Sequence, residues 1–288
     1  MLHIIYHGYF SFNIHHVVRD LLEKSDDALA KPHTDYALEY REGHIVATDL
    51  KGDAAPDAVL FFDKDILLAK AMAKDALVLN NPRAIALADD KIATWEMLAS
   101  EVPMIDTIPG PFHYRASTPT DTYLDYLEAR FGYPMVVKAA KGSFGEQVFL
   151  AKDRDELVEQ IEAMGNVDYL VQRFISESAG VDKRVLIVGD AVVGAIERRN
   201  DRDFRANLAA GSTAKPISLT REEARIALKA HRAMGLDFSG IDLIDSKAGP
   251  LVIEVNSNMG YLGFQEATGI DVSRLILDHL SRRLKAHM

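Results

Sequence analysis

The chain has 288 residues and no cysteine, which excludes disulfides, thiolate metal sites and a cysteine nucleophile and fits a reducing, cytoplasmic compartment. Its formal net charge is −10, from 33 Lys and Arg against 43 Asp and Glu, which argues against a broad nucleic-acid footprint. No apolar run approaches the roughly 20 residues that span a membrane, and the first residues resemble a strand rather than a secretory signal. We therefore expect a folded protein with neither a nucleic-acid nor a membrane partner.

The first ninety residues predict a small α/β domain. A helix is predicted from the apolar spacing between residues 14 and 22, a hairpin around Arg41-Glu42-Gly43, and a second helix from Ile66. The expected strands are short apolar runs at residues 2–6, 58–62 and 77–79. The last of these runs is followed by Asn80-Asn81-Pro82, which is typical of a turn.

The rest of the chain alternates helical patterns with strands joined by hairpins, which predicts an α+β arrangement. Helices are expected at residues 91–99, 123–131, 153–164 and 221–234 and from 271 onward. Strands are expected at residues 135–139, 147–151, 169–175, 183–188, 191–198, 238–244 and 250–256. The overall class is therefore α/β with an α+β C-terminal part, and we expect three domains at residues 1–90, 91–175 and 176–288.

Three oxygen-bearing side chains, Asp242, Glu254 and Asn256, are predicted to converge on one hairpin. Glu254 and Asn256 are two apart in a strand, so their side chains leave on the same face. Asp242 falls opposite Glu254 if the hairpin turns near Ala248. Carboxylate and amide oxygens suit a hard cation such as Mg²⁺, and we expect Asp242 and Glu254 to face solvent and metal. A merely solvated polar face is the alternative.

A second candidate is Lys138 with the loop at residues 141–147, whose sequence includes Gly142-Ser143-Phe144-Gly145. Backbone N–H groups of a glycine-containing loop can cover phosphates, and Lys138 would add a point charge. A plain β-turn is the alternative, since glycines are common in hairpins. A lysine inside an apolar strand, such as Lys138, is less common than glycines in a hairpin, because its ammonium group needs a partner.

A third candidate is a basic cluster in this acidic chain, and we expect Arg184 and Arg198 to meet across a sheet. Its members lie within 23 residues and are Lys183, Arg184, Arg198, Arg199, Arg202 and Arg205. Neighbouring acids permit a salt-bridged surface, whereas an unpaired cluster would attract phosphates or carboxylates. The ten histidines show no zinc-binding spacing.

These blocks, taken in order, resemble the RimK family of α-L-glutamate ligases within the ATP-grasp superfamily. The resemblance is strong from Asp90-Lys91 to about Asp271-Val272. It is carried by Tyr133-Pro134-Met135-Val136-Val137-Lys138, Gly142-Ser143-Phe144-Gly145, Asp182-Lys183-Arg184, Ile196-Glu197-Arg198-Arg199, Asp203-Phe204-Arg205-Ala206-Asn207 and Leu251-Val252-Ile253-Glu254-Val255-Asn256. It implies an ATP-grasp fold behind an N-terminal α/β domain, with ATP held between two subdomains.

The resemblance also implies roles for individual residues. Lys91, Lys138 and the loop residues Gly142, Ser143, Phe144 and Gly145 would contact ATP phosphates. Gln172, Arg173 and Phe174 would form the hinge beside adenine, and Asp182 would help to hold the nucleotide. Arg205 and Asn207 would meet phosphates, with Arg205, Lys138 and Arg184 as the catalytic groups. Asp242, Glu254 and Asn256 would bind Mg²⁺, for which Mn²⁺ is a substitute.

The implied reaction is ATP-dependent amide formation through an acyl phosphate, with ADP as product. The expected partners are an amino acid, glutamate first, and a carboxylate acceptor on a peptide, protein tail or small molecule; assembly into homo-oligomers is left open. Alternatives are a LysX-type ligase of amino-acid biosynthesis and a nucleotide-binding regulatory module without turnover. Tyr261 and Phe264 fit either an acceptor pocket or the core.

Overall fold

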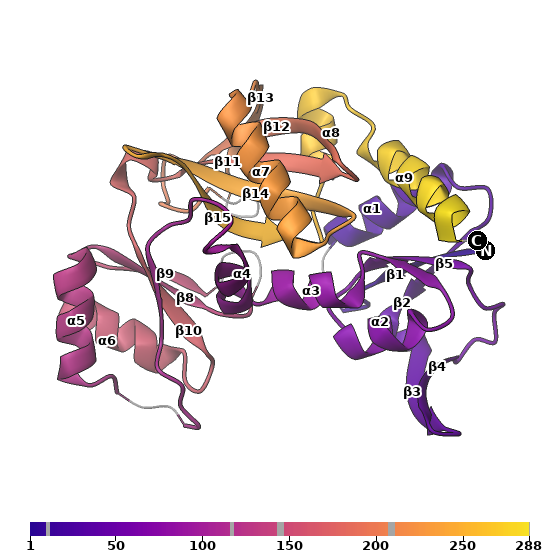
Figure 1. Cartoon of the computed structure of the whole chain (residues 1–288), viewed down its shortest axis with the longest axis horizontal. Coiled ribbons are helices and arrows are strands. Elements are labelled where there is room, and N and C mark those ends of the chain that lie inside the picture. The colour runs from indigo at the N-terminus through magenta and orange to yellow at the C-terminus, as the bar shows by residue number, and fades with distance from the viewer. Residues whose placement is uncertain (10–11, 116–117, 143–146, 207–210, 288) are drawn as a thin grey trace.

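The computed structural model describes residues 1–9, 12–115, 118–142, 147–206 and 211–287 (Figure 1). Helices and strands alternate in the first part of the chain, and antiparallel hairpins dominate the last part, so the predicted α/β class is confirmed. The described strands form three main sheets and one separate hairpin, β3 (Tyr36–Arg41) with β4 (His44–Asp49). No described helix combines the length and the apolar character that crossing a membrane requires.

The N-terminal sheet is parallel and has the order β2-β1-β5-β6. Its strands are β1 (Leu2–Tyr6), β2 (Ala28–Pro32), β5 (Ala58–Phe62) and β6 (Leu77–Leu79), and its helices include α1 (Phe12–Glu23) and α2 (Ile66–Met72). Every residue of β5 is buried, as expected for a strand covered on both faces. Strand β2 was not predicted, because its alanines and its terminal proline give little β propensity.

The central sheet is antiparallel and has the order β7-β10-β8-β9. Its strands are β7 (Thr107–Pro109), β8 (Met135–Ala139), β9 (Val148–Ala151) and β10 (Tyr169–Arg173), and its helices are α5 (Asp121–Phe131) and α6 (Arg154–Ala163). Both helices begin at side-chain caps, from Thr120 and Asp153. Their apolar faces pack with this sheet in one core cluster.

The C-terminal sheet is also antiparallel and has the order β13-β12-β11-β14-β15. Its strands are β11 (Val181–Val188), β12 (Ala191–Arg199), β13 (Thr213–Ile217), β14 (Phe238–Ser246) and β15 (Gly249–Asn256). Helix α7 (Arg221–Met234) starts at a capping box between Thr220 and Glu223 and packs its apolar stripe on this sheet.

Helices α3 (Pro82–Asp89) and α4 (Lys91–Leu98) connect the N-terminal sheet to the other two. Helix α3 was not predicted, because Asn80-Asn81-Pro82 was interpreted only as a turn. The side chain of Asn81 instead accepts the N–H of Ala84, and Pro82 occupies the first turn, where its missing N–H costs nothing. Helix α8 (Leu262–Thr268) and strands β7 and β13 were also missed, since each is short.

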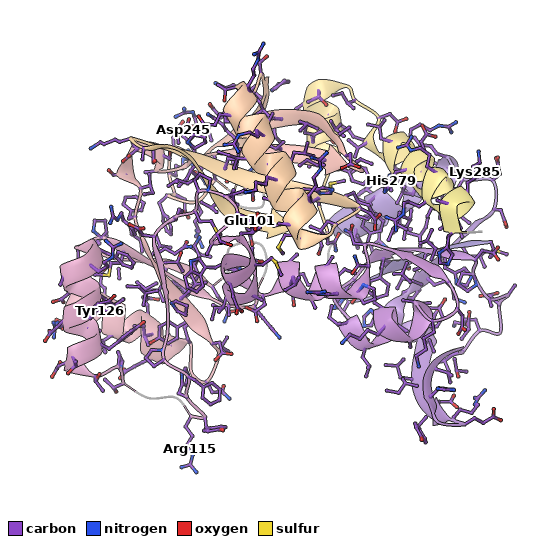
Figure 2. The ribbon with its side chains drawn as sticks, in the orientation of Figure 1. Glu101, Arg115, Tyr126, Asp245, His279 and Lys285 are labelled. Carbon is purple, nitrogen blue, oxygen red and sulfur yellow. The ribbon has the colours of Figure 1, made fainter. Side chains whose placement is uncertain are left out.

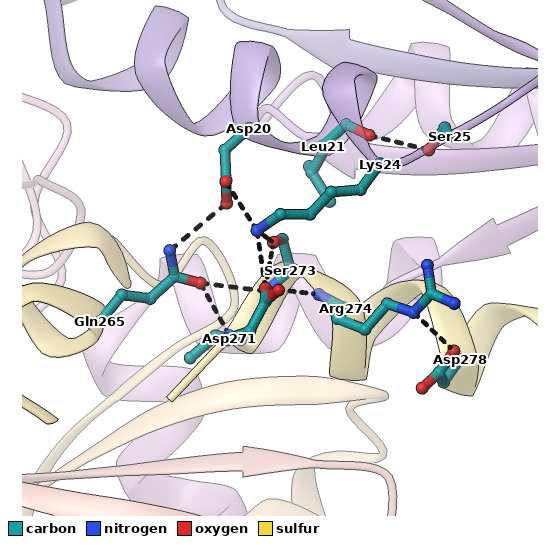
Figure 3. A network of polar contacts seen from close by, with 10 residues as sticks. Asp20, Leu21, Lys24, Ser25, Gln265, Asp271, Ser273, Arg274 and Asp278 are labelled. Carbon is teal, nitrogen blue, oxygen red and sulfur yellow. Dashed lines mark hydrogen bonds and ion pairs between the residues drawn. The ribbon is translucent and has the colours of Figure 1, made fainter. Parts of the chain in front are cut away.

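The first and last parts of the chain share one hydrophobic core, and α9 (Val272–His287) lies beside α1 (Figure 1). Figure 3 shows the polar contacts at this junction: the Lys24 ammonium lies 2.8 Å from Asp20 and 2.7 Å from both Asp271 and Ser273. Farther along α9, His279 (Figure 2) lies with its Nε2 3.1 Å from the carboxylate of buried Asp237. Tyr261 and Phe264 are buried in the shared core, so the core alternative holds for both.

Asn80 joins the N-terminal sheet to the C-terminal sheet through hydrogen bonds at both ends of its amide. Its side chain is fully buried. Its Nδ2 donates to the carbonyls of Phe238 and Ser257, at 3.0 and 2.9 Å. Its Oδ1 accepts the backbone N–H groups of Asp237 and Phe238, at 2.6 and 3.0 Å. All four hydrogen-bonding positions of the amide are therefore used.

We expect Asn80→Asp to lower the free energy of unfolding by about 3 kcal/mol, because two donors would become acceptors facing carbonyl oxygens. Urea denaturation followed by circular dichroism measures the change. The neighbouring Asn81→Asp is the matched control: aspartate still caps α3, and only the donor to Gly235 is lost, so its effect should be about 1 kcal/mol or less. Equal effects at the two positions would contradict the role assigned to Asn80.

Candidate active site

A narrow pocket lies where α4, the central sheet and the C-terminal sheet meet. Lys91, Thr94 and Trp95 come from α4, Lys138 and Gln172 from the central sheet, and Ile253 and Glu254 from β15. Its free volume is about 10 Å³, which is room for about one water molecule.

Lys138 places an ammonium group in this pocket from the middle of an apolar strand. Its neighbours Val137 and Ala139 are buried in the sheet. In the described part of the chain the ammonium forms no hydrogen bond or ion pair. Burial lowers the pKa of Lys138 to about 8, with a smaller contribution in the same direction from Lys91, while Glu254 and Asp242 act against the shift. Among the described residues, the site thus holds a cation without a close anionic partner.

Lys91 is the second cation of the pocket and the first residue of α4. Asp90 caps this helix, since its Oδ1 accepts the N–H of Ile92 at 2.9 Å. The backbone N–H of Lys91 donates to the carbonyl of Ala140 at 2.8 Å, which ties α4 to the end of β8. The Lys91 ammonium donates to the carbonyl of Gly142 at 3.1 Å and lies 3.7 Å from Glu254. Two lysines therefore face a single carboxylate, so the pocket favours an anion.

Gln172 offers an unused acceptor to the same pocket. Its Nε2 donates to Oγ1 of Thr107 at 2.9 Å, which fixes the orientation of the amide. Its Oε1 is buried and has no hydrogen-bond partner among the described residues. A buried acceptor without a partner costs about 1–3 kcal/mol, so a ligand that donates a hydrogen bond here would remove that cost.

Behind the pocket, two arginines and two aspartates form a buried network across β11, β12 and β14. Arg184 donates to both oxygens of Asp242, at 2.7 and 2.6 Å, and Arg198 does the same to Asp182. Nη2 of Arg198 also lies 3.0 Å from Oδ2 of Asp242. Asp242 is 1 % exposed and Arg198 is 2 % exposed. Paired forks of this kind balance the four charges within the sheet.

Burial and charge act in opposite directions on the two aspartates. Burial raises the pKa of Asp182 to about 6, and the nearby Asp242 adds to the shift while Arg198 opposes it. Burial also raises the pKa of Asp242, but Arg184 and Arg198 together outweigh it and hold this pKa below its ordinary value. Both carboxylates are therefore ionised at neutral pH.

Two expectations about these residues are corrected by the structure. Asp242 does not face solvent, because the two guanidinium groups enclose it. Arg184 and Arg198 do not meet directly across the sheet: Arg198 is paired with Asp182, and Arg184 with Ile196. The two guanidinium groups would repel each other in direct contact, and the carboxylate of Asp242 lies between them instead. The expected pairing of Asp242 with Glu254 is confirmed.

Glu254 and Asn256 are the more available oxygen ligands beside Asp242. The register of β14 and β15 shifts between Asp242 and Leu243, which leaves Ile253 as an extra residue. This bulge turns both Ile253 and Glu254 toward the pocket. The side chain of Asn256 reaches Oδ2 of Asp242 at 3.3 Å. Glu254, Asn256 and the remaining lone pair on Oδ1 of Asp242 together form an oxygen-donor set that fits Mg²⁺.

Other predicted site residues are only partly placed. Ser143, Phe144, Gly145 and Asn207 lie outside the described residues. Arg173 pairs with Asp106 at 2.7 Å, and the ring of Phe174 meets that of Phe204 edge-on. Arg205 donates to Asp203 at 2.6 Å and reaches the carbonyl of Val148 at 3.5 Å.

Much of the basic cluster forms salt bridges, as the alternative of a salt-bridged surface predicted. Lys183 bonds Glu223 and Asp245, at 2.5 and 2.8 Å, and Arg199 lies 3.5 Å from Glu197. Sequence reasoning missed Trp95 and Met104 as pocket residues. The position of Trp95 one turn after Lys91 on the same helix was the available signal, and Met104 had none.

Comparison with known proteins gives this site a context. A family model described as a RimK-like ATP-grasp domain matches residues 88–280. The chain is 41% identical over 207 residues to the ribosomal protein bS6–L-glutamate ligase of Escherichia coli O81 (strain ED1a), covering 71% of this chain and 67% of that protein.

Solved ATP-grasp structures share the fold, which confirms the predicted fold. The D-alanine–D-alanine ligase from Bacillus anthracis complexed with ATP has a TM-score of 0.74 at 17% identity, covering 100% of this chain and 99% of that one. The ATP-grasp ligase PsnB complexed with a minimal precursor, Mg and ADP has a TM-score of 0.69 at 16% identity, covering 99% and 98%.

We expect Asp242→Asn to lower the free energy of unfolding by about 3 kcal/mol, because it leaves the buried guanidinium of Arg198 without full charge compensation. Glu254→Gln, directly opposite on β15, should change it by no more than about 0.5 kcal/mol, since Glu254 is half-buried and its closest cation lies at 3.7 Å. Urea denaturation without nucleotide or Mg²⁺ compares the two. A stable Asp242→Asn protein would show that the network does not depend on this carboxylate.

Proposed function

The chain belongs to the RimK-like ATP-grasp family of ATP-dependent ligases, and from that premise we propose that it joins an amino acid to a carboxylate acceptor through an acyl phosphate. The observation that carries this proposal is the pair of lysines in the pocket. Lys138 forms no ion pair within the described residues. The carboxylate of Glu254 lies 3.7 Å from the Lys91 ammonium and also attracts the charge of Lys138 from farther away. A polyphosphate would supply the negative charge that these groups lack.

ATP fits the other features of the pocket as well. The unpartnered Oε1 of Gln172 would accept a hydrogen bond from the exocyclic amine of adenine. Thr94 and Trp95 border the same space from α4. We propose that the backbone of Arg173 and Phe174, at the end of β10, completes the adenine site, and that Gly142 and the loop residues after it cover the phosphates.

Mg²⁺ would be held by Glu254, Asn256 and Asp242, and when bound it would neutralise charge on the transferred phosphoryl group. The network behind these residues would keep them in place, because Arg184 and Arg198 hold Asp242 from the side away from Glu254. Lys138 and Lys91 would bind phosphate oxygens. Arg184 and Arg205 are the proposed further cations around the reacting groups.

The proposed reaction has two steps. An oxygen of the acceptor carboxylate attacks the γ-phosphorus of ATP, a new oxygen–phosphorus bond forms, and ADP leaves. The amine of the incoming amino acid then attacks the acyl carbon, phosphate leaves with the carboxylate oxygen, and the amine loses a proton. No step needs a protein nucleophile, which agrees with a chain that has no cysteine.

We infer that glutamate is the amino acid and that the acceptor is a peptide or protein tail. The support is the 41% identity to an enzyme named as a ligase of glutamate to ribosomal protein bS6. An ADP-release screen of amino acids against carboxylate acceptors, with peptide C-termini included, identifies the pair. We also propose that residues 1–90, 91–175 and 176–288 act as three domains, since each contains one main sheet.

Nucleotide affinity should depend on pH through Lys138, whose pKa burial lowers to about 8. Phosphates bind the ammonium form, so affinity for a non-hydrolysable ATP analogue should fall as pH rises through 8, by up to roughly tenfold per pH unit. Lys138→Arg stays protonated and should lose this dependence, while Lys138→Met should bind at least about tenfold more weakly than the wild type near neutral pH, and this difference should shrink as pH rises and the wild-type lysine loses its proton. Calorimetric titration between neutral and alkaline pH is the measurement. Parallel pH profiles for the wild type and Lys138→Arg would remove Lys138 from the phosphate site.

Replacing the amino acid by hydroxylamine should trap the acyl phosphate as a hydroxamate, with ADP and phosphate as the other products. Colorimetric detection of the hydroxamate and chromatography of the nucleotides report both. Omitting the acceptor is the control and should abolish hydroxamate formation. AMP and pyrophosphate as products would contradict the proposal, because they indicate transfer of the adenylyl group.

A further inference from the structure

We propose that His7, His33 and Asp63 form a binding site for a transition-metal dication of the zinc class. These three residues lie at the carboxyl edge of the N-terminal sheet, apart from the pocket described above. A ligand atom of each lies within 4.8 Å of those of the others. Two imidazoles and one carboxylate suit zinc and similar ions, whereas Mg²⁺ prefers oxygen ligands alone.

The register of the sheet brings these residues together. Tyr6 of β1 is paired with Pro32 of β2 on one side and with Phe62 of β5 on the other. The next residue of each strand is His7, His33 or Asp63, so the three follow one row across three adjacent parallel strands. The carboxyl edge of a parallel sheet is the usual place for a ligand site.

The carboxylate of Asp63 is held in place through one oxygen, which leaves the other oxygen available to a cation. Asp63 is 4 % exposed, and its Oδ1 accepts the N–H groups of Lys64 and Asp65, at 2.6 and 2.8 Å. Its Oδ2 is buried and accepts no hydrogen bond within the described residues. The first oxygen therefore fixes the carboxylate, and the second is left pointing at the histidines.

The contact between Asp63 and His33 also points to a cation. Oδ2 of Asp63 lies 3.2 Å from Nδ1 of His33. The N–H of Gly8 donates to that same Nδ1 at 3.1 Å, so the nitrogen presents a lone pair rather than a proton. Two lone pairs facing each other repel, but two ligands of one tetrahedral zinc-like ion lie roughly 3.3–3.6 Å apart, given bonds of about 2.0–2.2 Å, which is close to the separation of these two atoms.

The loop after β1 can release the ring nitrogens for a metal. Tyr9 donates its N–H to Nδ1 of His7 at 3.2 Å, and the rings of His7 and His33 lie 4.6 Å apart between centroids. Gly8 and Tyr9 are exposed, so their N–H groups can bond water when a metal takes the nitrogens. An anion would fit worse, because the buried carboxylate of Asp63 would repel it.

This site does not depend on the proposed ligase function. It nonetheless lies near the end of β15, since Asn258, two residues after Asn256, donates to the carbonyl of Phe62 at 3.1 Å. Three protein ligands leave an open coordination position, as in zinc sites that bind water or a ligand oxygen.

Titration of the full chain with Co²⁺ in a large excess of Mg²⁺ tests the proposal. Visible absorption bands reveal nitrogen-containing Co²⁺ sites, while Mg²⁺ occupies sites built from oxygens alone. We expect saturation at one Co²⁺ per chain and displacement of the bands by Zn²⁺. Asp63→Asn should weaken binding at least about tenfold, and its amide oxygen can still accept the bonds from Lys64 and Asp65.

Three comparisons make the result decisive. His33→Gln should weaken Co²⁺ binding as Asp63→Asn does, so that the conclusion does not depend on the folding of one variant. Zn²⁺ should raise the melting temperature of the wild type but of neither variant. His44→Gln removes an exposed imidazole from β4 and should bind Co²⁺ normally, as should Glu254→Gln. Undiminished binding by Asp63→Asn, loss of binding in Glu254→Gln, or no absorption bands at all would overturn the assignment.

Discussion

The pairing of Asp182 and Asp242 with Arg198 and Arg184 is the constraint on which the site depends. These four charges are buried in the middle of a five-stranded sheet, where an unpaired charge would cost several kcal/mol. In the register of β11, β12 and β14, Asp182 is paired with Arg198 and Asp242 with Arg184. On the other side of β14, Asp242 is paired with Glu254, and the bulge at Ile253 turns Ile253 and Glu254 toward the pocket.

Because the network is neutral, the charge of the pocket is set by the groups in front of it. Two lysines and one glutamate remain there, and the burial of Lys138 is unfavourable until an anion arrives. An anion bound beside the ammonium would offset this cost. We propose that this is why a lysine is tolerated in an apolar strand, since its ammonium forms no ion pair among the described residues.

Sequence patterns predicted the parts of the fold that depend on local spacing. Counting from a turn centred on Ala248 gave Asp242 opposite Glu254, and this pairing is correct; the turn itself lies between Ser246 and Gly249, and the extra residue Ile253 supplies the one-residue shift. The burial of Asp242 could not be predicted, because alternation along a strand assigns a face but not the partners that cover it. The partner of Arg198 was also missed: it was expected opposite Arg184, whereas it pairs with Asp182, two residues earlier on β11. The row of His7, His33 and Asp63 could not be predicted from the sequence. It requires strand β2, whose alanines and proline have little β propensity.

The central claim is that this site transfers the γ-phosphoryl group of ATP to a carboxylate. Following an oxygen label from that carboxylate is the most direct measurement. With an acceptor labelled with ¹⁸O in its reacting carboxylate, the account predicts that inorganic phosphate carries a labelled oxygen for every amide formed, because the oxygen that attacks phosphorus leaves with it. Unlabelled phosphate accompanying amide formation, or the label recovered in AMP, would contradict it.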